Sequence, residues 1–159
     1  MAQMFLHLTG IAGESLDDHF KDYIELYDWN WTVTNKLPEK RTGSDVKTDL
    51  TVGDIVVKKI CDKASANLMR YCALGKNIDR GLIFCRKLQG EKPVVFLLIE
   101  LRGVKISDVK VNVQPDDRIH EEVSLNMSQV FVTYRRQNEG GHIKGDVGFN
   151  FDVADNHEI

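Results

Sequence analysis

Hydrophobic and polar residues alternate along most of this chain, and a period of two is typical of β-strands that bury one face. Met4, Leu6 and Leu8 share one parity near the start. The segment from Val94 to Leu101 is nearly continuous apolar sequence, as expected for a central strand, and Gly103 separates it from a further alternating segment. The pattern predicts a mainly β fold, an antiparallel β-barrel or sandwich with one flanking α-helix.

The same alternation marks three more strands towards the end of the chain. One face of each strand is mostly apolar. These faces carry Ile119, Glu121, Val123 and Leu125 in the first strand, Val130, Val132 and Tyr134 in the second, and Val147, Phe149 and Phe151 in the third. Turn chemistry at Pro115-Asp116-Asp117 precedes the first of them.

One segment has helical periodicity. Leu68, Met69 and Cys72 form an apolar stripe, Ser65 can cap the helix N-terminus, and Gly75 supplies a left-handed stop. A single helix of this length cannot form a core by itself. We therefore expect it to close the open mouth of the barrel or to lie on its wall.

The apolar residues change from even-numbered to odd-numbered positions between two neighbouring stretches. Ile24 and Leu26 fall on one parity, whereas Trp29 and Trp31 fall on the other. A slip of one residue reverses the faces of a strand, so an extra residue is needed to keep both sets inward. The pattern predicts a β-bulge near Tyr27-Asp28.

A long polar segment runs from Asn35 to Asp49 and contains Pro38 and Gly43. It is too long for a tight hairpin, and loops of this kind are often functional.

Composition describes one domain over residues 1–159: 42% of the residues are hydrophobic and 28% charged, with 3 prolines. The net charge of -3 argues against a surface that binds nucleic acid or anionic lipid. The basic pair Lys58-Lys59 is interpreted as a solvated strand end. No segment approaches the roughly 20 apolar residues of a membrane span, and we expect no membrane insertion. The N-terminus lacks secretory features, which predicts folding in the cytoplasm.

The residue types of catalysis and metal binding do not converge. In His120-Glu121-Glu122, adjacent strand side chains point to opposite faces, and we expect a solvent-exposed strand. Ser15, Asp17 or Asp18 and His19 lack the spacing of a triad, and triads are recognised by geometry. Cys61, Cys72 and Cys85 match neither a disulfide framework nor a zinc motif, and are expected to be reduced and mostly buried. The sequence predicts no enzyme and no cofactor.

Collinear motifs along nearly the whole chain carry a family resemblance. They are Met4-Phe5-Leu6-His7-Leu8, Gly13-Glu14-Ser15, Ile24-Glu25-Leu26, Trp29-Asn30-Trp31, Asp62 to Met69, Gly75-Lys76, Asp117-Arg118, Val123-Ser124-Leu125-Asn126, Gln129-Val130, Tyr134 and Gly148-Phe149-Asn150. In these the chain resembles the haemolysin-coregulated protein (Hcp) family. It departs from the usual pattern where Ser65-Ala66 replaces threonine-proline and Phe149 replaces tryptophan.

The resemblance implies a small β-barrel that forms a homo-hexameric ring. Such rings stack into the inner tube of the bacterial type VI secretion system. The expected partners are further copies of the chain, a VgrG-like spike protein, the contractile sheath and effector proteins carried in the lumen. The resemblance also implies folding in the bacterial cytoplasm, followed by secretion without a signal peptide.

Two sets of residues follow as candidates for function. Asn30 and Thr32 face away from the two tryptophans, and the resemblance suggests that this surface lines the lumen. The long polar loop is the candidate for contact between stacked rings, through Lys36, Glu39, Lys40, Arg41, Asp45 and Lys47. In relatives this loop is often glycine-rich, whereas here it is charged.

Two other function classes stay open from the sequence. One is a monomeric binding β-barrel that keeps the fold without assembling, and the other is a small secreted enzyme or toxin. The oligomeric state separates the binding barrel from the tube subunit. A convergent nucleophile or metal cluster would mark the enzyme.

Overall fold

The computed structural model describes residues 3–37, 49–137 and 143–159. Its elements are β1 (Met4–Leu8), β2 (Ile24–Leu26), β3 (Asp28–Asn30), β4 (Val33–Lys36), β5 (Asp49–Val52), β6 (Ile55–Ile60), α1 (Ser65–Leu74), β7 (Ile78–Gln89), β8 (Lys92–Val113), β9 (Ile119–Asn126), β10 (Gln129–Gln137), β11 (Ile143–Asp152) and β12 (His157–Glu158). All strand pairings are antiparallel, which confirms the predicted fold class.

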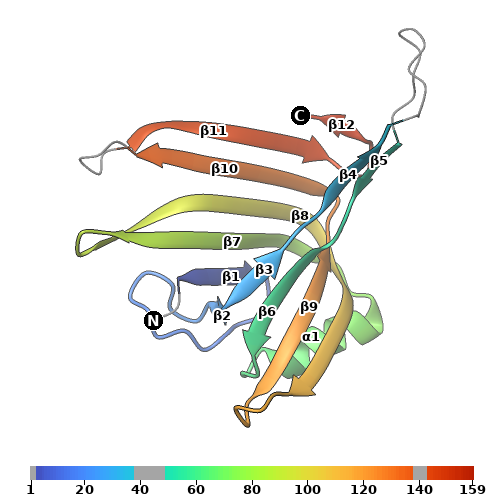
Figure 1. The fold of residues 1–159 in the computed structure, drawn as a ribbon. Coiled ribbons are helices and arrows are strands. Elements are labelled where there is room, and N and C mark those ends of the chain that lie inside the picture. The colour runs from blue at the N-terminus through green and yellow to red at the C-terminus, as the bar shows by residue number, and fades with distance from the viewer. Residues whose placement is uncertain (1–2, 38–48, 138–142) are drawn as a thin grey trace, which may run out of the picture.

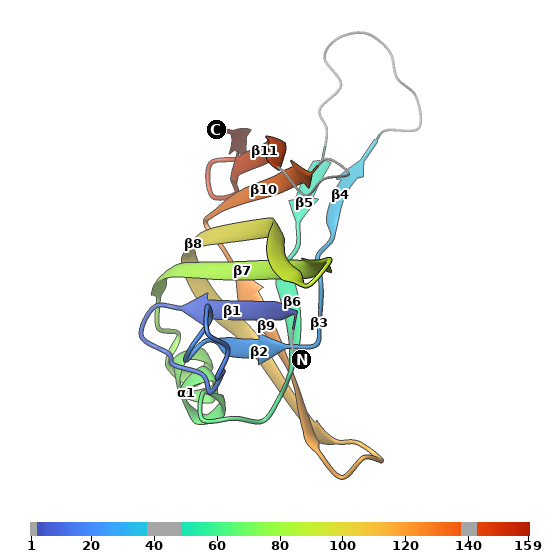
Figure 2. The same cartoon turned by 90° about the vertical axis from the view of Figure 1, so that its left-hand side faces the viewer.

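The strands form two layers that share one strand. The long sheet has the order β12-β11-β10-β8-β7-β1-β2. Beyond residue 104, β8 leaves this sheet and pairs with β9, which pairs with β6, which pairs with β3. We call this second layer, made of β3, β6, β9 and residues 105–113 of β8, the four-stranded sheet. Figure 1 shows it crossing in front of the long sheet, and in the turned view of Figure 2 it lies behind β7, β1 and β2.

The bend in β8 is built around Gly103. Its φ of 60° is left-handed, and a Cβ at this position would lie 2.7 Å from the Ser128 hydroxyl. The backbone N–H of Ser128 also donates to the carbonyls of Arg102 and Gly103. The turn between β9 and β10 is thereby fixed to the bend. The expectation that Gly103 separates two strands is wrong, because one strand continues through it and changes partner.

The core lies between the two layers. Leu6 and Ile83 from the long sheet and Val57 and Val123 from the four-stranded sheet are fully buried. α1 lies at the lower end of the barrel in Figures 1 and 2 and contributes the buried Leu68. The helix therefore closes one end of the barrel, which is one of the two placements that the sequence left open.

The irregularity predicted at Tyr27-Asp28 is present. β2 ends at Leu26, and both Tyr27 and Asp28 lie against Lys58, because the Tyr27 N–H donates to the Lys58 carbonyl while Asp28 is its register partner. The chain changes partner from β1 to β6 at this point. This change keeps Leu26 and Trp29 on the core side.

The prediction for the helix start is wrong. Ala64 occupies the N-cap without a side-chain bond, and the Ser65 hydroxyl instead accepts a hydrogen bond from the Asp62 N–H and donates one to Glu121. Met69 is 41% exposed, so the buried stripe of α1 is narrower than predicted. Gly75 has the predicted left-handed backbone, with a φ of 61°.

Two predictions about exposure also fail. Lys59 and Glu121 are buried, not solvated, because their parity on β6 and β9 points them inward. Cys61 is exposed while Cys85 is buried, and all three cysteines are free thiols.

Candidate assembly interface

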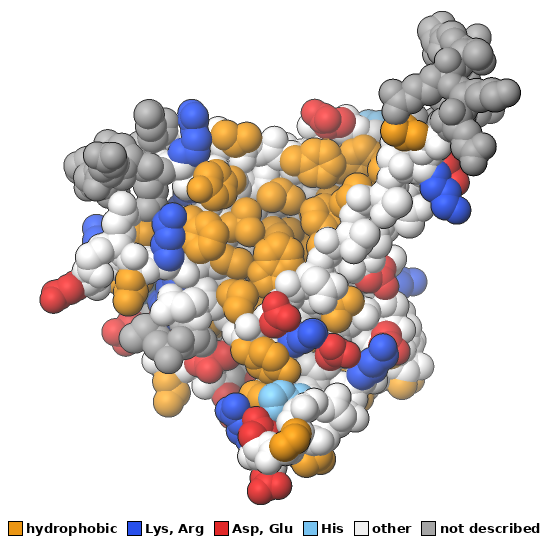
Figure 3. All heavy atoms as spheres, in the orientation of Figure 1, with side chains coloured by type: hydrophobic (Ala, Val, Ile, Leu, Met, Phe, Trp, Pro, Cys, Tyr) orange, Lys and Arg blue, Asp and Glu red, His pale blue; other side chains and the backbone are white. Residues whose placement is uncertain are grey.

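The outward face of the four-stranded sheet carries a row of alternating charges. The strand register places Asp28 beside Lys58, Lys58 beside Glu122, and Glu122 beside Lys110. The Lys58 ammonium lies 3.6 Å from Asp28 and 3.5 Å from Glu122. The Asp28 carboxylate and then that of Glu122 raise the pKa of Lys58. In Figure 3, acidic and basic side chains alternate over the lower part of the molecule, where this sheet lies.

Asn30 lies in the next row of the same face. Its register neighbours are Val56 on β6, then Ser124 on β9 and Asp108 on β8. Asn30 is exposed, whereas Trp29 before it is half-buried against the core. Thr32 is exposed too, but it follows the end of β3, where its carbonyl accepts a hydrogen bond from the Gly53 N–H. The structure thus places Asn30 within the polar face and Thr32 at its border.

Both outer strands of this sheet have an open edge. Within the described residues, β3 pairs only with β6, and residues 105–113 of β8 pair only with β9. An unpaired edge exposes a series of backbone N–H and C=O groups that can bind another strand. The charge row ends with Asp28 at one edge and Lys110 at the other.

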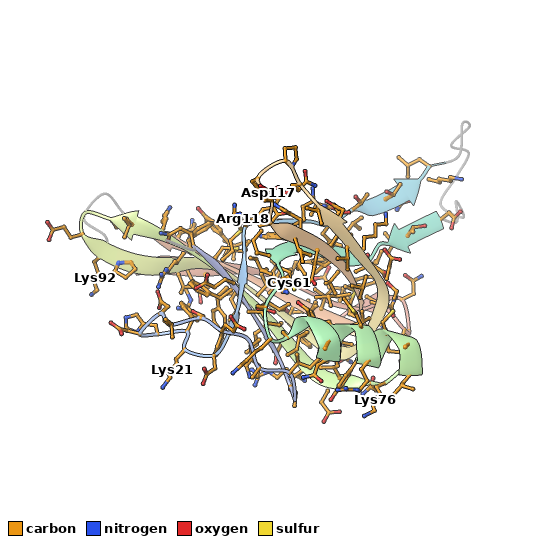
Figure 4. The ribbon with its side chains drawn as sticks, turned by 90° about the horizontal axis from the view of Figure 1, so that it is seen from below. Lys21, Cys61, Lys76, Lys92, Asp117 and Arg118 are labelled. Carbon is orange, nitrogen blue, oxygen red and sulfur yellow. The ribbon has the colours of Figure 1, made fainter. Side chains whose placement is uncertain are left out.

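The strands β8 and β9 continue as an arm below the barrel. Asp117 and Arg118 lie at its tip, on the side away from α1 and Lys76 in Figure 4. His120 ties the arm to the barrel, since its Nδ1 lies 2.8 Å from the Tyr27 hydroxyl and its Nε2 lies 3.0 Å from an Asp116 carboxylate oxygen. The Arg118 backbone N–H, followed by His120, lowers the pKa of Asp116 to about 2.

The core face of the long sheet stays partly uncovered. In the register row Cys85, Leu97, Tyr134 and Val147, the exposed fraction rises from 4% at Cys85 to 42% at Tyr134 and 55% at Val147. The next row ends at Phe149, which is 39% exposed. We call the open part of this face the apolar shelf; it comprises Phe96, Val132, Tyr134, Val147, Phe149 and Phe151. Figure 3 shows it as a continuous hydrophobic area over β8, β10 and β11.

A buried charge cluster lies behind the polar face. The Lys59 ammonium lies 2.6 Å from Glu121 and 2.9 Å from Asp62, and it donates to the Ser65 hydroxyl at 3.2 Å. Lys59 is 0% and Glu121 1% exposed. Because Ser65 is the first residue of α1 and Asp62 lies in the segment just before it, the cluster fastens the helix to β6 and β9. Sequence reasoning missed it, although two opposite charges at inward parities were a usable signal.

The predicted stacking residues are only partly visible. Lys36 is exposed at the end of β4, opposite Asp49 on β5. Glu39, Lys40, Arg41, Asp45 and Lys47 lie outside the described residues. The β4–β5 hairpin itself stands off the barrel at the end opposite the β8–β9 arm (Figure 2).

Among the residue types that could support catalysis, the side chains of Ser15 and Asp17 have structural partners. Ser15 is buried and its hydroxyl accepts a hydrogen bond from the Asp17 N–H, while the Asp17 carboxylate pairs with Arg86 and accepts from the His19 N–H. Among residues 3–37, 49–137 and 143–159, no group of histidine, cysteine and acidic residues could hold a metal. That part of the chain also contains no helix with the length and hydropathy of a membrane span.

Fold and surface together define a class of protein, a small antiparallel β-barrel with one end helix and open strand edges. The family model described as "Type VI secretion system effector, Hcp" matches residues 5–134. The curated protein hcp1 of Pseudomonas aeruginosa is 30% identical over 155 residues, and the match covers 96% of each chain. The chain therefore belongs to the Hcp family.

Solved structures agree with this assignment. A type VI secretion system effector from Yersinia pestis has a TM-score of 0.78 at 31% identity, with 94% of this chain and 99% of that one covered. Hcp1 from Salmonella typhimurium has a TM-score of 0.79 at 29% identity, with both chains fully covered.

Proposed function

We propose that the chain is the structural subunit of the inner tube of a bacterial type VI secretion system. Hexameric rings of the chain stack into a tube, which sheath contraction expels together with effectors held in the lumen. The observation that carries the proposal is the whole-length similarity to Hcp proteins. The two open edges of the four-stranded sheet support it, since a ring of copies would cover them.

We assign the polar face of the four-stranded sheet, with Asn30 and Thr32, to the lumen. The opposite face of this sheet packs against the long sheet and α1, so most of the subunit lies on that side. Subunits around an axis have more room at the outside of the ring, which directs the bulky side outward. The alternating charges give the polar face little net field, which suits cargo proteins of varied charge.

Labelling tests the lumen assignment. In a Cys61→Ser background, Asn30→Cys reacts slowly with a maleimide that carries a bulky polymer once rings have formed. Lys76→Cys, beyond the end of α1, is the matched control and reacts at the same rate before and after assembly. Equal rates for both positions in assembled rings would place Asn30 outside the lumen.

The loop between β4 and β5 is the proposed contact between stacked rings, with Lys36 at its base and Glu39, Lys40, Arg41, Asp45 and Lys47 along it. A polar, charged contact suits an interface that must form and separate again. Replacing residues 38–47 by a short glycine-serine linker is expected to leave rings and abolish tubes. Loss of the rings would show that the loop acts within a ring.

Secretion tests the function as a whole. The proposed partners are a VgrG-like spike, the sheath and effectors, and the chain leaves the cell only with the tube. In a bacterium with the matching machinery, the chain is expected in the culture medium when the sheath gene is intact and inside the cells when it is deleted. A cytoplasmic marker controls for lysis. Equal amounts in the medium of both strains would contradict the proposal.

A further inference from the structure

The β4–β5 hairpin joins the barrel through residues 31–32 and 53–55, which we call the hairpin junction. We propose that the hairpin junction holds the hairpin at a fixed angle to the barrel, and that Asp54 is its main positioning residue. The inference rests on the proposed function and deepens it, because a hairpin that is already aimed loses less freedom when it contacts the next ring.

The hairpin junction contains a β-bulge. Asn30 on β3 pairs with Val56 on β6, and Val33 on β4 pairs with Val52 on β5. Between these pairs, two residues of one strand lie opposite three of the other, residues 53–55. A bulge bends its strand and increases the local twist, so the hairpin is turned relative to the four-stranded sheet at this point. Figure 2 shows β4 and β5 above β3 and β6, away from the barrel.

Asp54 is the extra residue of this bulge. The Gly53 N–H donates to the Thr32 carbonyl at 2.9 Å, which continues the register of β4 on β5 as far as Thr32. The register of β3 on β6 places Trp31 opposite Ile55, so Asp54 falls between the two registers. Bulges redirect side chains, and here the Asp54 side chain reaches the neighbouring strands β8 and β9.

The Asp54 carboxylate connects the hairpin junction to the other half of the four-stranded sheet. One oxygen accepts a hydrogen bond from the Asn126 side-chain amide at 3.0 Å, and the other accepts one from the Ser107 hydroxyl. Ser107 is itself the extra residue of a second bulge, since the register of β8 on β9 shifts between Ile106 and Asp108. Asp54 therefore joins one bulge to the other and to the last residue of β9.

Trp31 holds the core side of the hairpin junction. Its indole N–H donates to the Gly53 carbonyl at 2.9 Å, and its ring packs against the core. A Cβ at Gly53 would lie 3.0 Å from the Thr32 carbonyl oxygen, so the two strands approach closely here. Contacts on the polar face through Asp54 and on the core side through Trp31 together restrict pivoting of the hairpin.

The direction of the hairpin depends on these contacts. Within the described residues, β4 and β5 pair only with each other. The two hydrogen bonds of Asp54 lie at the surface, where water competes for the same groups. Removing them is therefore expected to free the hairpin while the barrel stays folded.

Four variants test the hairpin junction. Asp54→Ala removes both hydrogen bonds, and Trp31→Phe keeps a ring on the core but loses the indole N–H. Asp54→Asn is the conservative control, because its amide oxygen can accept from Asn126 and its amide nitrogen can donate to the Ser107 hydroxyl. Asp79→Ala removes an exposed carboxylate near the start of β7 and controls for the lost charge.

The angle of the hairpin is measured with two spin labels. They are attached at Thr34→Cys on β4 and Lys76→Cys beyond α1, in a background with Cys61→Ser and Cys72→Ser. An excess of unlabelled chain keeps labelled subunits apart. The distance distribution is expected to be narrow in the parent and in both controls, and broader in the two variants that lose hydrogen bonds of the hairpin junction.

Tube formation is compared in the same variants, without labels, by sedimentation and negative-stain images. Asp54→Ala is expected to give rings of the parent's mass and to require a protein concentration at least about tenfold higher for tubes. Asp54→Asn is expected to form tubes at the parent's concentration.

The outcomes separate the hairpin junction from the proposed function. A distance distribution as narrow in Asp54→Ala and Trp31→Phe as in the parent, or tubes of Asp54→Ala at the parent's concentration, would overturn the positioning role and leave the proposed function in place. A parent protein without rings or tubes would overturn the proposed function, and the width of the distance distribution would still decide whether the hairpin junction fixes the hairpin.

Discussion

Lys58 and Lys59 are neighbours on β6, and each pairs with a glutamate of β9, yet the two pairs lie in opposite environments. Lys58 is 3.5 Å from Glu122 on the exposed polar face. Lys59 is 2.6 Å from Glu121 inside the barrel, where both side chains are almost fully buried. Burial decides what each pair does: the inner pair fixes the fold, and the outer pair stays available to a partner.

The difference follows from desolvation. An exposed ion pair is weak because water and salt screen it. A buried pair has lost its water, and removing one partner leaves the other as an uncompensated charge. The inner cluster adds contacts to Asp62 and Ser65 and so holds α1. The outer row instead extends to Asp28 and Lys110 at the two open edges.

The largest expected effect comes from breaking the inner pair. Lys59→Met leaves Glu121 buried without its cation and is expected to lower the free energy of unfolding by about 3 to 5 kcal/mol. The double variant Lys59→Met with Glu121→Leu recovers most of that loss, because no charge is left buried. Urea unfolding at one fixed protein concentration measures both variants, since the proposed assembly would also contribute to stability. A loss below about 1 kcal/mol for Lys59→Met would contradict the role of the cluster.

A second expected effect concerns assembly and leaves the fold intact. Val113→Asp places a charge on the arm at a side chain that is 68% exposed. Substitutions at exposed sites usually change stability by within about 0.5 kcal/mol, so the subunit stays folded while the peak of the proposed hexamer is lost in size-exclusion chromatography. Val33→Asp, at a 46% exposed valine of β4, is the control and keeps the ring mass. A ring mass unchanged in Val113→Asp would show that the arm lies outside the contacts between subunits of the proposed ring.

A partly buried pair tests whether burial is the deciding factor elsewhere. Asp17 binds Arg86, whose guanidinium lies over the Phe5 ring at 4.8 Å and over the Phe20 ring at 5.6 Å. Asp17→Asn is expected to cost about 1 to 2 kcal/mol near neutral pH, because it weakens a hydrogen bond between charged groups. The exposed neighbour Asp18 supplies the control, Asp18→Asn, which should have no comparable effect.

The pH dependence of that variant has a definite sign. The hydrogen bond from Arg86 lowers the pKa of Asp17 below its ordinary value. A carboxylate with a lowered pKa stabilises the fold above its unfolded pKa, which is about 3.9 for aspartate, and this contribution is lost as the pH falls through the folded value. The difference between parent and Asp17→Asn should be constant near neutral pH and shrink below about pH 4. A difference that stays constant as the pH falls below about 4 would contradict the charge argument.

The smallest expected effect is on the outer pair within one subunit. Lys58→Ala removes the central cation of the exposed row and should shift the urea midpoint least of these variants. Adding salt to about 1 M should abolish the shift, because screening already weakens an exposed pair. A shift of the urea midpoint as large as that of Lys59→Met would contradict the claim that the exposed pair contributes less to stability than the buried pair.

The alternation of residues along single strands predicted which side chains of this protein point inward and which point outward. The inward sets at Met4, Leu6 and Leu8 and the outward position of Asn30 follow from period two alone. The sequence also located the helix and its left-handed stop at Gly75. These features depend on neighbours close in the chain, where side-chain direction is fixed by the backbone.

Features set by distant pairings escaped prediction. Lys59 and Glu121 were each expected to be solvated, because a lone charge on a strand is usually exposed. Only the register of β6 on β9 brings them together. The open edges likewise require the sheet order, and the continuation of β8 through Gly103 requires the contact with Ser128. The alternation along one strand shows which face of the sheet a side chain occupies. Open edges and buried pairs depend on which strands are neighbours, and the sequence alone does not show this.

The mass of the purified protein in solution tests the central claim most directly. Light scattering combined with negative-stain images of the same fraction should give six times the 18.1 kDa subunit mass and ring-shaped particles. A mass of one subunit at every concentration, without rings, would contradict the account and favour a monomeric binding barrel.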